Sequence, residues 1–261
     1  MRHRWMRSAH PAVPQPYFLL SVSFPNHHGG RVVEAIKLSI ILPTNGGGKR
    51  LTMAVAEALA LAGEALSTYE LIIVDDASDH ETARIADRLA ATHQHVALLR
   101  FTRRLGYRRA LHDAWGAASG QYIAALDLSG PASLRELPQL CAAAPGHAVV
   151  LGYRERPTHS LRELIFNTTA RRIAPEVRDP ALGLALFHAD QRDLIATAGP
   201  DRLTHIAAYA AAQQRGLPVT QVSIKAQTPL APSSSPSSAL GVGMLVAAGS
   251  LWLLRRIMRH P

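Results

Sequence analysis

The chain has 261 residues, of which 48% are hydrophobic, so it is long enough to bury one substantial core without a second full domain. Lys and Arg outnumber Asp and Glu by 28 to 19, and the formal charge of +9 favours anionic partners such as phosphates, lipid headgroups or nucleic acid. The single cysteine, Cys141, excludes an intramolecular disulfide and any metal cluster built from several cysteines.

The first 36 residues are rich in Arg, His and Pro and contain one short apolar run, Tyr17–Phe24. This run is too short to cross a membrane. The sequence Pro25-Asn26-His27-His28 follows it in place of the small residues that mark a signal-peptide cleavage site. We therefore expect residues 1–36 to be a disordered basic extension.

From Lys37 onward, short apolar runs alternate with longer stretches of helical character. The predicted strands are Leu38–Leu42, Leu71–Val74, Val96–Leu99, Tyr122–Leu126 and Val149–Gly152, and the predicted helices are Leu51–Ser67, Thr82–His93, Arg108–Ser119 and Thr158–Arg172. This alternation is typical of βαβ units, so we expect an α/β fold with a mainly parallel sheet covered by helices on both faces.

Polar residues follow three of the predicted strands at the point where each strand ends. Pro43, Thr44 and Asn45 follow the first strand, Asp75 and Asp76 follow the second, and Asp127 follows the fourth. Ligands of such sheets bind beyond the carboxyl ends of the strands. The sequence therefore predicts a binding site at this edge, although Ser78 or Asp79 as a helix cap, with the two aspartates merely solvated, explains the second group equally well.

The C-terminal part of the chain changes character after residue 228. Residues 229–238 are rich in Pro and Ser and are predicted to be a linker after a domain spanning residues 37–228. Residues 239–261 begin with about 16 mostly apolar residues, or roughly 24 Å of helix against a hydrocarbon core of about 30 Å. Arg255, Arg256 and Arg259 follow. We expect a membrane-associated helix with a basic end, in a shallow, re-entrant or interfacial attachment or packed against a partner's helices, in preference to an ordinary span. A buried terminal helix is the alternative.

Several of these segments together resemble the family-2 glycosyltransferases. The resemblance covers about Leu38 to Leu194 and rests on Leu38–Pro43, Ile72–Ser78, Arg103–Ala110 and Ala118–Asp127 in that order. Two further segments, Gly152–Arg154 and Arg178–Gly183, are similar to motifs of the branch that transfers sugars to polyprenyl phosphates. Four motifs in the family's order and spacing are much more specific than any one of them alone.

The resemblance implies a GT-A fold that binds a nucleotide-sugar donor. It assigns the nucleotide to Pro43, Thr44, Asn45, Asp75, Asp76, Arg104 and Gly106. It makes Asp127 the catalytic residue that holds Mg²⁺ or Mn²⁺ beside the diphosphate, because oxygen ligands suit these ions. Arg154 and Arg162 are assigned to the phosphate of a lipid acceptor.

The chain departs from the family at the metal motif. The family's second carboxylate, two residues after Asp127, is replaced here by Ser129, which is a weaker ligand. Two hypotheses therefore remain. One is a hexosyltransferase that moves a sugar to a polyprenyl-phosphate or other membrane-associated acceptor at the cytoplasmic face of the membrane. The alternative is a catalytically inactive relative that acts as a binding or regulatory partner in a membrane complex.

Other partners and sites receive less support from the sequence. The basic residues are scattered, aromatic residues make up 5% of the chain, and no nucleic-acid recognition module is present, so we expect no nucleic-acid partner. His112, His159 and His205 lack the spacing of metal ligands and are predicted to be structural or surface residues. The sequence leaves the oligomeric state, the donor base, the sugar and the acceptor open.

Overall fold

The computed structural model describes residues 37–64, 68–128, 132–155, 161–196, 198 and 203–224. The predicted basic extension, the Pro/Ser linker and the apolar C-terminal segment lie outside these residues. Within the described part of the chain, no helix combines the length and the apolar character needed to cross a bilayer.

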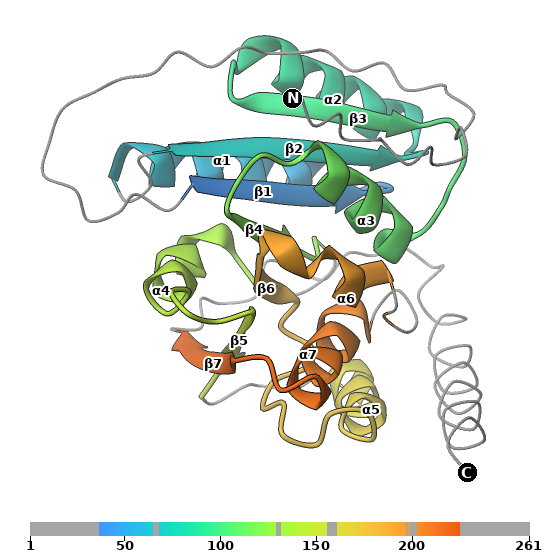
Figure 1. The fold of residues 1–261 in the computed structure, drawn as a ribbon. Coiled ribbons are helices and arrows are strands. Elements are labelled where there is room, and N and C mark those ends of the chain that lie inside the picture. Colours follow the sequence, from blue (N-terminus) through green and yellow to red (C-terminus); the bar gives the residue numbers. More distant parts are fainter. Residues whose placement is uncertain are drawn as a thin grey trace, which may run out of the picture.

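Seven strands form one mixed sheet in the order β3-β2-β1-β4-β6-β5-β7 (Figure 1). The strands are β1 (Lys37–Thr44), β2 (Thr68–Asp76), β3 (Val96–Phe101), β4 (Tyr122–Leu126), β5 (Val149–Arg154), β6 (Leu184–His188) and β7 (Val219–Ile224). β1 pairs in parallel with β2 and β4, β2 with β3, and β5 with β7, whereas β6 is antiparallel to both β4 and β5. The prediction of a mainly parallel α/β sheet is confirmed.

Helices cover both faces of this sheet. The α-helices are α1 (Gly48–Glu64), α2 (His80–Thr92), α3 (Tyr107–Ala117), α4 (Leu137–Ala142), α5 (Leu161–Ala170), α6 (Arg192–Ala196) and α7 (Thr204–Gln214), and the short 3₁₀ turns are η1 (Leu134–Glu136) and η2 (Ala189–Gln191). Helix α1 begins at Gly48, three residues before the predicted start at Leu51. The strands β6 and β7 were not predicted.

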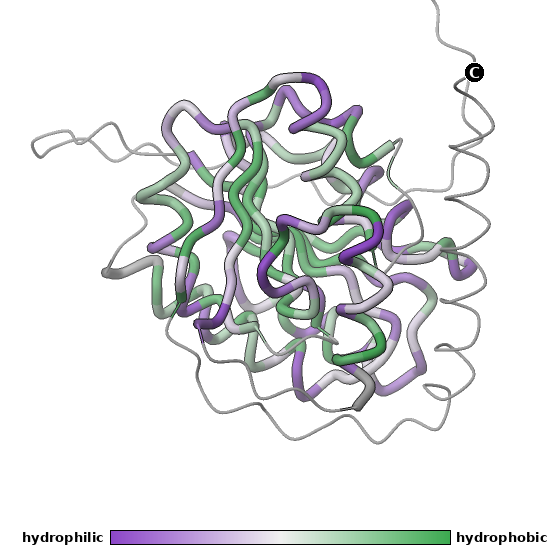
Figure 2. Tube along the Cα trace, turned by 90° about the horizontal axis from the view of Figure 1, so that it is seen from below, coloured by the Kyte–Doolittle hydropathy of each residue, from purple (hydrophilic) through white to green (hydrophobic). Residues whose placement is uncertain are grey.

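Strand β1 shows why the sheet needs cover on both sides. All of its residues after Lys37 are buried, and their side chains alternate between two apolar cores. Leu38, Ile40 and Leu42 point into the core that contains residues of α1, α2 and α4, whereas Ile41 points into the core that contains residues of α3, α6 and α7. Figure 2 shows the strands as an apolar centre, with hydrophilic residues in the surrounding loops and helix ends. A strand buried on both faces is the pattern expected of a parallel sheet.

Candidate active site

The carboxyl ends of β1, β2 and β4 meet at one edge of the sheet. Thr44 and Asp75 are direct partners in the β1–β2 register, and β4 runs parallel to β1 on its other side. Asp127 follows the last residue of β4, and the Arg103–Gly106 loop follows β3 at the same edge. The fold therefore brings the polar residues that follow three predicted strands to one place.

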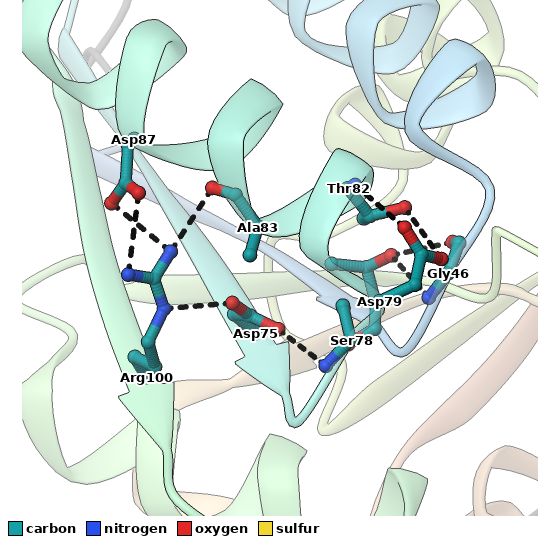
Figure 3. Close-up of polar contacts among 9 residues, drawn as sticks. Gly46, Asp75, Ser78, Asp79, Thr82, Ala83, Asp87 and Arg100 are labelled. Carbon is teal, nitrogen blue, oxygen red and sulfur yellow. Dashed lines mark hydrogen bonds and ion pairs between the residues drawn. The ribbon is translucent and has the colours of Figure 1, made fainter.

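Asp75 is held inside the protein by two hydrogen bonds. Its side chain is 2% exposed, and it accepts hydrogen bonds from the Ser78 backbone N–H at 2.9 Å and from Nε of Arg100 at 2.8 Å (Figure 3). Arg100, on β3, also donates to the backbone oxygen of Ala83 and pairs with Asp87 on α2. Arg100 was missed from the sequence. The sequence carried no signal for it, because its position directly opposite Asp75 follows from the β2–β3 register, which only the structure shows.

Asp76 fixes the basic loop that precedes α3. Its two carboxylate oxygens accept hydrogen bonds from the backbone N–H groups of Leu105 at 2.6 Å and Gly106 at 2.8 Å. Asp76 itself is 2% exposed, whereas Arg103 and Arg104 on the loop are exposed. A carboxylate oxygen accepts two hydrogen bonds, so Asp76 retains acceptor capacity for a ligand. The loop is thus positioned so that its arginines lie free in solvent at the carboxyl edge of the sheet.

The loop after β1 is closed by a small turn. The Thr44 hydroxyl donates to the backbone oxygen of Gly46 at 2.8 Å, and the Ser78 hydroxyl donates to the backbone oxygen of Thr44 at 3.4 Å. Pro43 is buried and Asn45 is exposed. This arrangement ties the loop after β1 to the turn after β2.

The alternative interpretation of the second aspartate group is correct in one part. Asp79 is the N-cap of α2, and its carboxylate accepts a hydrogen bond from the Thr82 N–H at 2.8 Å (Figure 3). This bond lowers the pKa of Asp79. Asp75 and Asp76, by contrast, are buried and hydrogen-bonded, so they are not merely solvated residues near a helix end.

Asp127 lies against the loop that carries Arg178–Gly183. Its backbone N–H donates to the oxygen of Gly183 at 2.9 Å. Gly183 has a φ of +76°, and a Cβ atom added to it would lie 3.0 Å from the Cβ of Asp127. Only glycine combines this left-handed backbone with such a close approach. Residues more than fifty positions apart in the sequence therefore meet at Asp127.

His205 is the functional candidate that sequence reasoning missed. It lies on α7, is 8% exposed, and its Nε2 is hydrogen-bonded to the Tyr107 hydroxyl at 2.6 Å. Burial lowers the pKa of His205 to about 4, while the negative charge of Asp127 acts in the opposite direction. A neutral imidazole is consequently placed within electrostatic reach of Asp127. Helix α7 was not predicted from the sequence, so nothing there placed His205 near Asp127.

The two arginines assigned to an acceptor phosphate differ in what surrounds them. The Arg154 side chain is 5% exposed, and its Nε and Nη2 donate to the two oxygens of Asp179 at 2.6 and 3.0 Å. Its charge is therefore compensated within the protein, and Glu163 lies 3.9 Å from its Nη2. The side chain of Arg162 lies outside the described residues. Acceptor binding by either residue remains a prediction.

A divalent ion fits this edge only if the donor supplies ligands. The described residues contain no group of three or more His, Cys, Asp or Glu side chains able to hold a metal. Asp127 offers one carboxylate, His205 is a neutral imidazole nearby, and Ser129 lies outside the described residues. Mg²⁺ is commonly bound through one or two carboxylates together with substrate phosphates. The residues present fit such an open, substrate-completed site.

Comparison with known proteins shows what the part of the chain around this edge is similar to. Residues 39–152 match the family model described as Glycosyl transferase family 2. Over these residues the chain is similar to that family. The matched stretch contains nearly all of β1, all of β2 to β4, most of β5 and Asp127, and it ends at Gly152, before the Asp179 and His205 segments.

Two curated relatives resemble the chain over part of its length. The undecaprenyl-phosphate 4-deoxy-4-formamido-L-arabinose transferase of Photorhabdus laumondii is 25% identical over 151 residues, which are 58% of this chain and 46% of the relative. Glycosyltransferase AglD of Haloferax volcanii is 30% identical over 111 residues, covering 40% of this chain and 17% of the relative. The chain thus spans less than half the length of these relatives.

Solved structures share the fold of this chain. Glucosyl-3-phosphoglycerate synthase from Mycobacterium tuberculosis, in complex with Mn²⁺, UDP-glucose and phosphoglyceric acid, superposes with a TM-score of 0.61 at 18% identity. The match covers 85% of this chain and 84% of that structure. The predicted GT-A fold is confirmed, and the neighbouring structure binds a divalent ion together with a nucleotide sugar.

Proposed function

We propose that this chain transfers a sugar from a nucleotide-sugar donor to a polyprenyl-phosphate or other membrane-associated acceptor. The observation that carries the proposal is the meeting of Asp127, the Asp76-bound basic loop and the Arg178–Gly183 loop at one edge of the sheet. The polyprenyl-phosphate acceptor is further supported by the names of the curated relatives.

The donor would lie across the carboxyl ends of β1 and β2. Asp76 keeps the Arg103–Gly106 loop in place, so that Arg104 can compensate the charge of the diphosphate. Thr44 and Asn45 border the nucleoside from the other strand. Asp75 maintains the turn at Ser78, and each of its carboxylate oxygens has capacity for a further hydrogen bond.

The transfer itself requires little proton chemistry from the protein. An oxygen of the acceptor phosphate attacks the anomeric carbon, the bond from that carbon to the diphosphate oxygen breaks, and nucleoside diphosphate leaves with inversion of configuration. The attacking phosphate is already an anion, so a general base is not needed. A divalent ion held by Asp127 would neutralise charge on the departing diphosphate. Neutral His205 adds no second positive charge at that position.

We place this activity at the cytoplasmic face of a membrane. The net charge of +9 favours contact with anionic lipid surfaces, and the proposed acceptor is itself a lipid phosphate. Vesicle co-sedimentation of the full chain tests this part separately. Binding to anionic but not to neutral vesicles supports it, and equal recovery in the supernatant with both contradicts it.

The test of the transferase function is calorimetric titration of the full chain with UDP and with GDP, with and without Mn²⁺. We expect one nucleotide to bind more tightly with Mn²⁺, and Asp127→Asn to remove the metal-dependent part. Asp190→Asn is the matched control, because the Asp190 side chain is 82% exposed and lies on η2. Transfer of labelled sugar to polyprenyl phosphate should then be lost in Asp127→Asn and retained in Asp190→Asn.

The inactive relative is favoured by a different observation, the replacement of the second acidic residue by Ser129. It predicts nucleotide binding that is indifferent to Mn²⁺, unaffected by Asp127→Asn, and accompanied by no sugar transfer. That combination of results would replace the transferase proposal.

A further inference from the structure

Helix α1 contacts both ends of the segment that follows Asp127. Near its start, Nη1 of Arg50 donates a hydrogen bond to the backbone oxygen of Leu128. Seven residues later, Oε2 of Glu57 accepts hydrogen bonds from the Ser133 hydroxyl at 2.8 Å and from the Leu134 N–H at 3.1 Å. Seven residues are two helical turns, or about 10.5 Å, so both side chains project from the same face of α1.

The far end of this segment is fixed by a second set of contacts. The Ser133 N–H donates to a carboxylate oxygen of Glu136 at 3.0 Å, and Ser133 forms a capping box with Glu136 at the start of η1. Glu57 thus binds a residue whose backbone is already held in place. Leu128 and Ser133 are thus each bonded to a side chain of the same helix, α1.

Among the described residues, the space between the two anchors is small. A cavity of about 20 Å³ lies there, lined by Met53 and Ala54 of α1 and by apolar residues on either side of the segment. This volume accommodates roughly one water molecule. Arg50 and Glu57 therefore serve to hold protein groups, namely the Leu128 carbonyl, the Ser133 hydroxyl and the Leu134 N–H.

The backbone around Asp127 is consequently held from two directions. Its own N–H is bonded to the oxygen of Gly183, and the carbonyl of the next residue, Leu128, is bonded to Arg50. A carboxylate that binds a metal through few protein ligands depends strongly on such support, because its orientation is not fixed by neighbouring ligands. Helix α1 also begins directly after the loop that contains Thr44 and Asn45.

We propose that Arg50 and Glu57 are positioning residues that hold Leu128 and Ser133 and so orient the Asp127 carboxylate toward the metal and the diphosphate. The proposal rests on the proposed transferase function for the metal, and on the contacts alone for the anchoring. Because α1 joins the loop after β1 to the segment after β4, the two sides of the donor site are connected through one helix.

The anchoring is tested first, by hydrogen exchange of the full chain without metal or nucleotide. In Arg50→Met the Asp127 amide, and in Glu57→Leu the Leu134 amide, should exchange at least about tenfold faster than in the wild type. Glu57→Gln retains an acceptor oxygen for both bonds and should exchange like the wild type. Arg88→Met, an exposed charge loss on α2, is the second control. Unchanged exchange in Arg50→Met and Glu57→Leu would overturn the proposal.

The positioning role is tested by the Mn²⁺ dependence of UDP and GDP binding. We expect Arg50→Met and Glu57→Leu to weaken metal-dependent binding by about tenfold or more, with metal-free nucleotide affinity unchanged and Glu57→Gln restoring the wild-type value. Faster exchange without any change in metal dependence would overturn the positioning role. If the wild type itself shows no Mn²⁺ dependence, the transferase proposal fails instead, and the exchange result still decides the anchoring.

Discussion

The buried ion pair between Arg154 and Asp179 offers the sharpest test of how this fold is stabilised. The two side chains are 5% and 0% exposed, and two hydrogen bonds at 2.6 and 3.0 Å join them. Removing one member leaves the other as a buried charge without a partner, which typically costs about 3–5 kcal/mol. We expect Arg154→Met to lower the free energy of unfolding by that amount, a large share of the roughly 5–15 kcal/mol that a domain possesses.

The double variant separates the energy of the ion pair from the cost of leaving one buried charge without a partner. In Arg154→Met combined with Asp179→Leu both charges are gone, and such replacements are often close to neutral. One cost remains, because the Arg154 backbone N–H also donates to Asp179 at 3.2 Å and would lose its acceptor. That loss is worth about 1–3 kcal/mol. The double variant should therefore be more stable than either single variant, with a large coupling energy in the cycle.

The assay is urea unfolding of the full chain, followed by circular dichroism. Arg109→Met is the matched control, because Arg109 and Asp113 are a similar 2.8 Å apart but the Arg109 side chain is 51% exposed. An exposed pair of this kind is worth at most about 1 kcal/mol. If Arg154→Met is no more destabilising than Arg109→Met, the burial argument is refuted. If it leaves stability intact but raises the KM for polyprenyl phosphate, the acceptor-phosphate role predicted from the sequence is supported instead.

Three further predictions follow from individual residues. Ala77 has a φ of +51°, which is strained for a residue with a Cβ atom, so Ala77→Gly should raise the unfolding free energy by about 0.5–1 kcal/mol in urea titrations; a loss of stability would contradict this. Gly120 is buried, and a Cβ there would lie 2.5 Å from the Ser39 nitrogen, so Gly120→Ala should cost at least about 1–3 kcal/mol, whereas the same change at Gly146→Ala meets no neighbouring atom and should cost only its backbone strain. His205 is buried and neutral with a pKa of about 4, below the value near 6.5 of an unfolded chain. The unfolded state therefore takes up a proton first as the pH falls, so the contribution of neutral His205 is complete above about pH 6.5 and is lost toward pH 4. In His205→Gln the free energy of unfolding should lack this decrease. If the wild type and His205→Gln show the same pH profile of unfolding free energy, His205 is solvated and the argument is wrong.

The sequence alone predicted the sheet centre and the edge of the sheet at which the candidate site lies. The apolar runs behind β1, β2 and β4 are long enough to be buried on both faces, and each ends in polar residues, so their position at one edge follows from parallel pairing. β6 and β7 escaped prediction for local reasons. β6 is a five-residue run without flanking helical or turn signals strong enough to separate it from other apolar stretches, and β7 is half-buried at the sheet edge.

Only the tertiary structure decided which side chains act together at that site. Arg50 meets Leu128 across 78 positions, Tyr107 meets His205 across 98, and Arg100 meets Asp75 across 25. No regular spacing in the sequence marks any of these pairs, because the contacts arise from strand order and helix packing and not from local periodicity. Likewise, only the structure shows that Arg154 is buried and paired with Asp179, while its role at an acceptor phosphate stays a prediction. Local sequence patterns specify where backbone segments go, whereas side-chain charge and protonation depend on neighbours that only folding brings within a few ångströms.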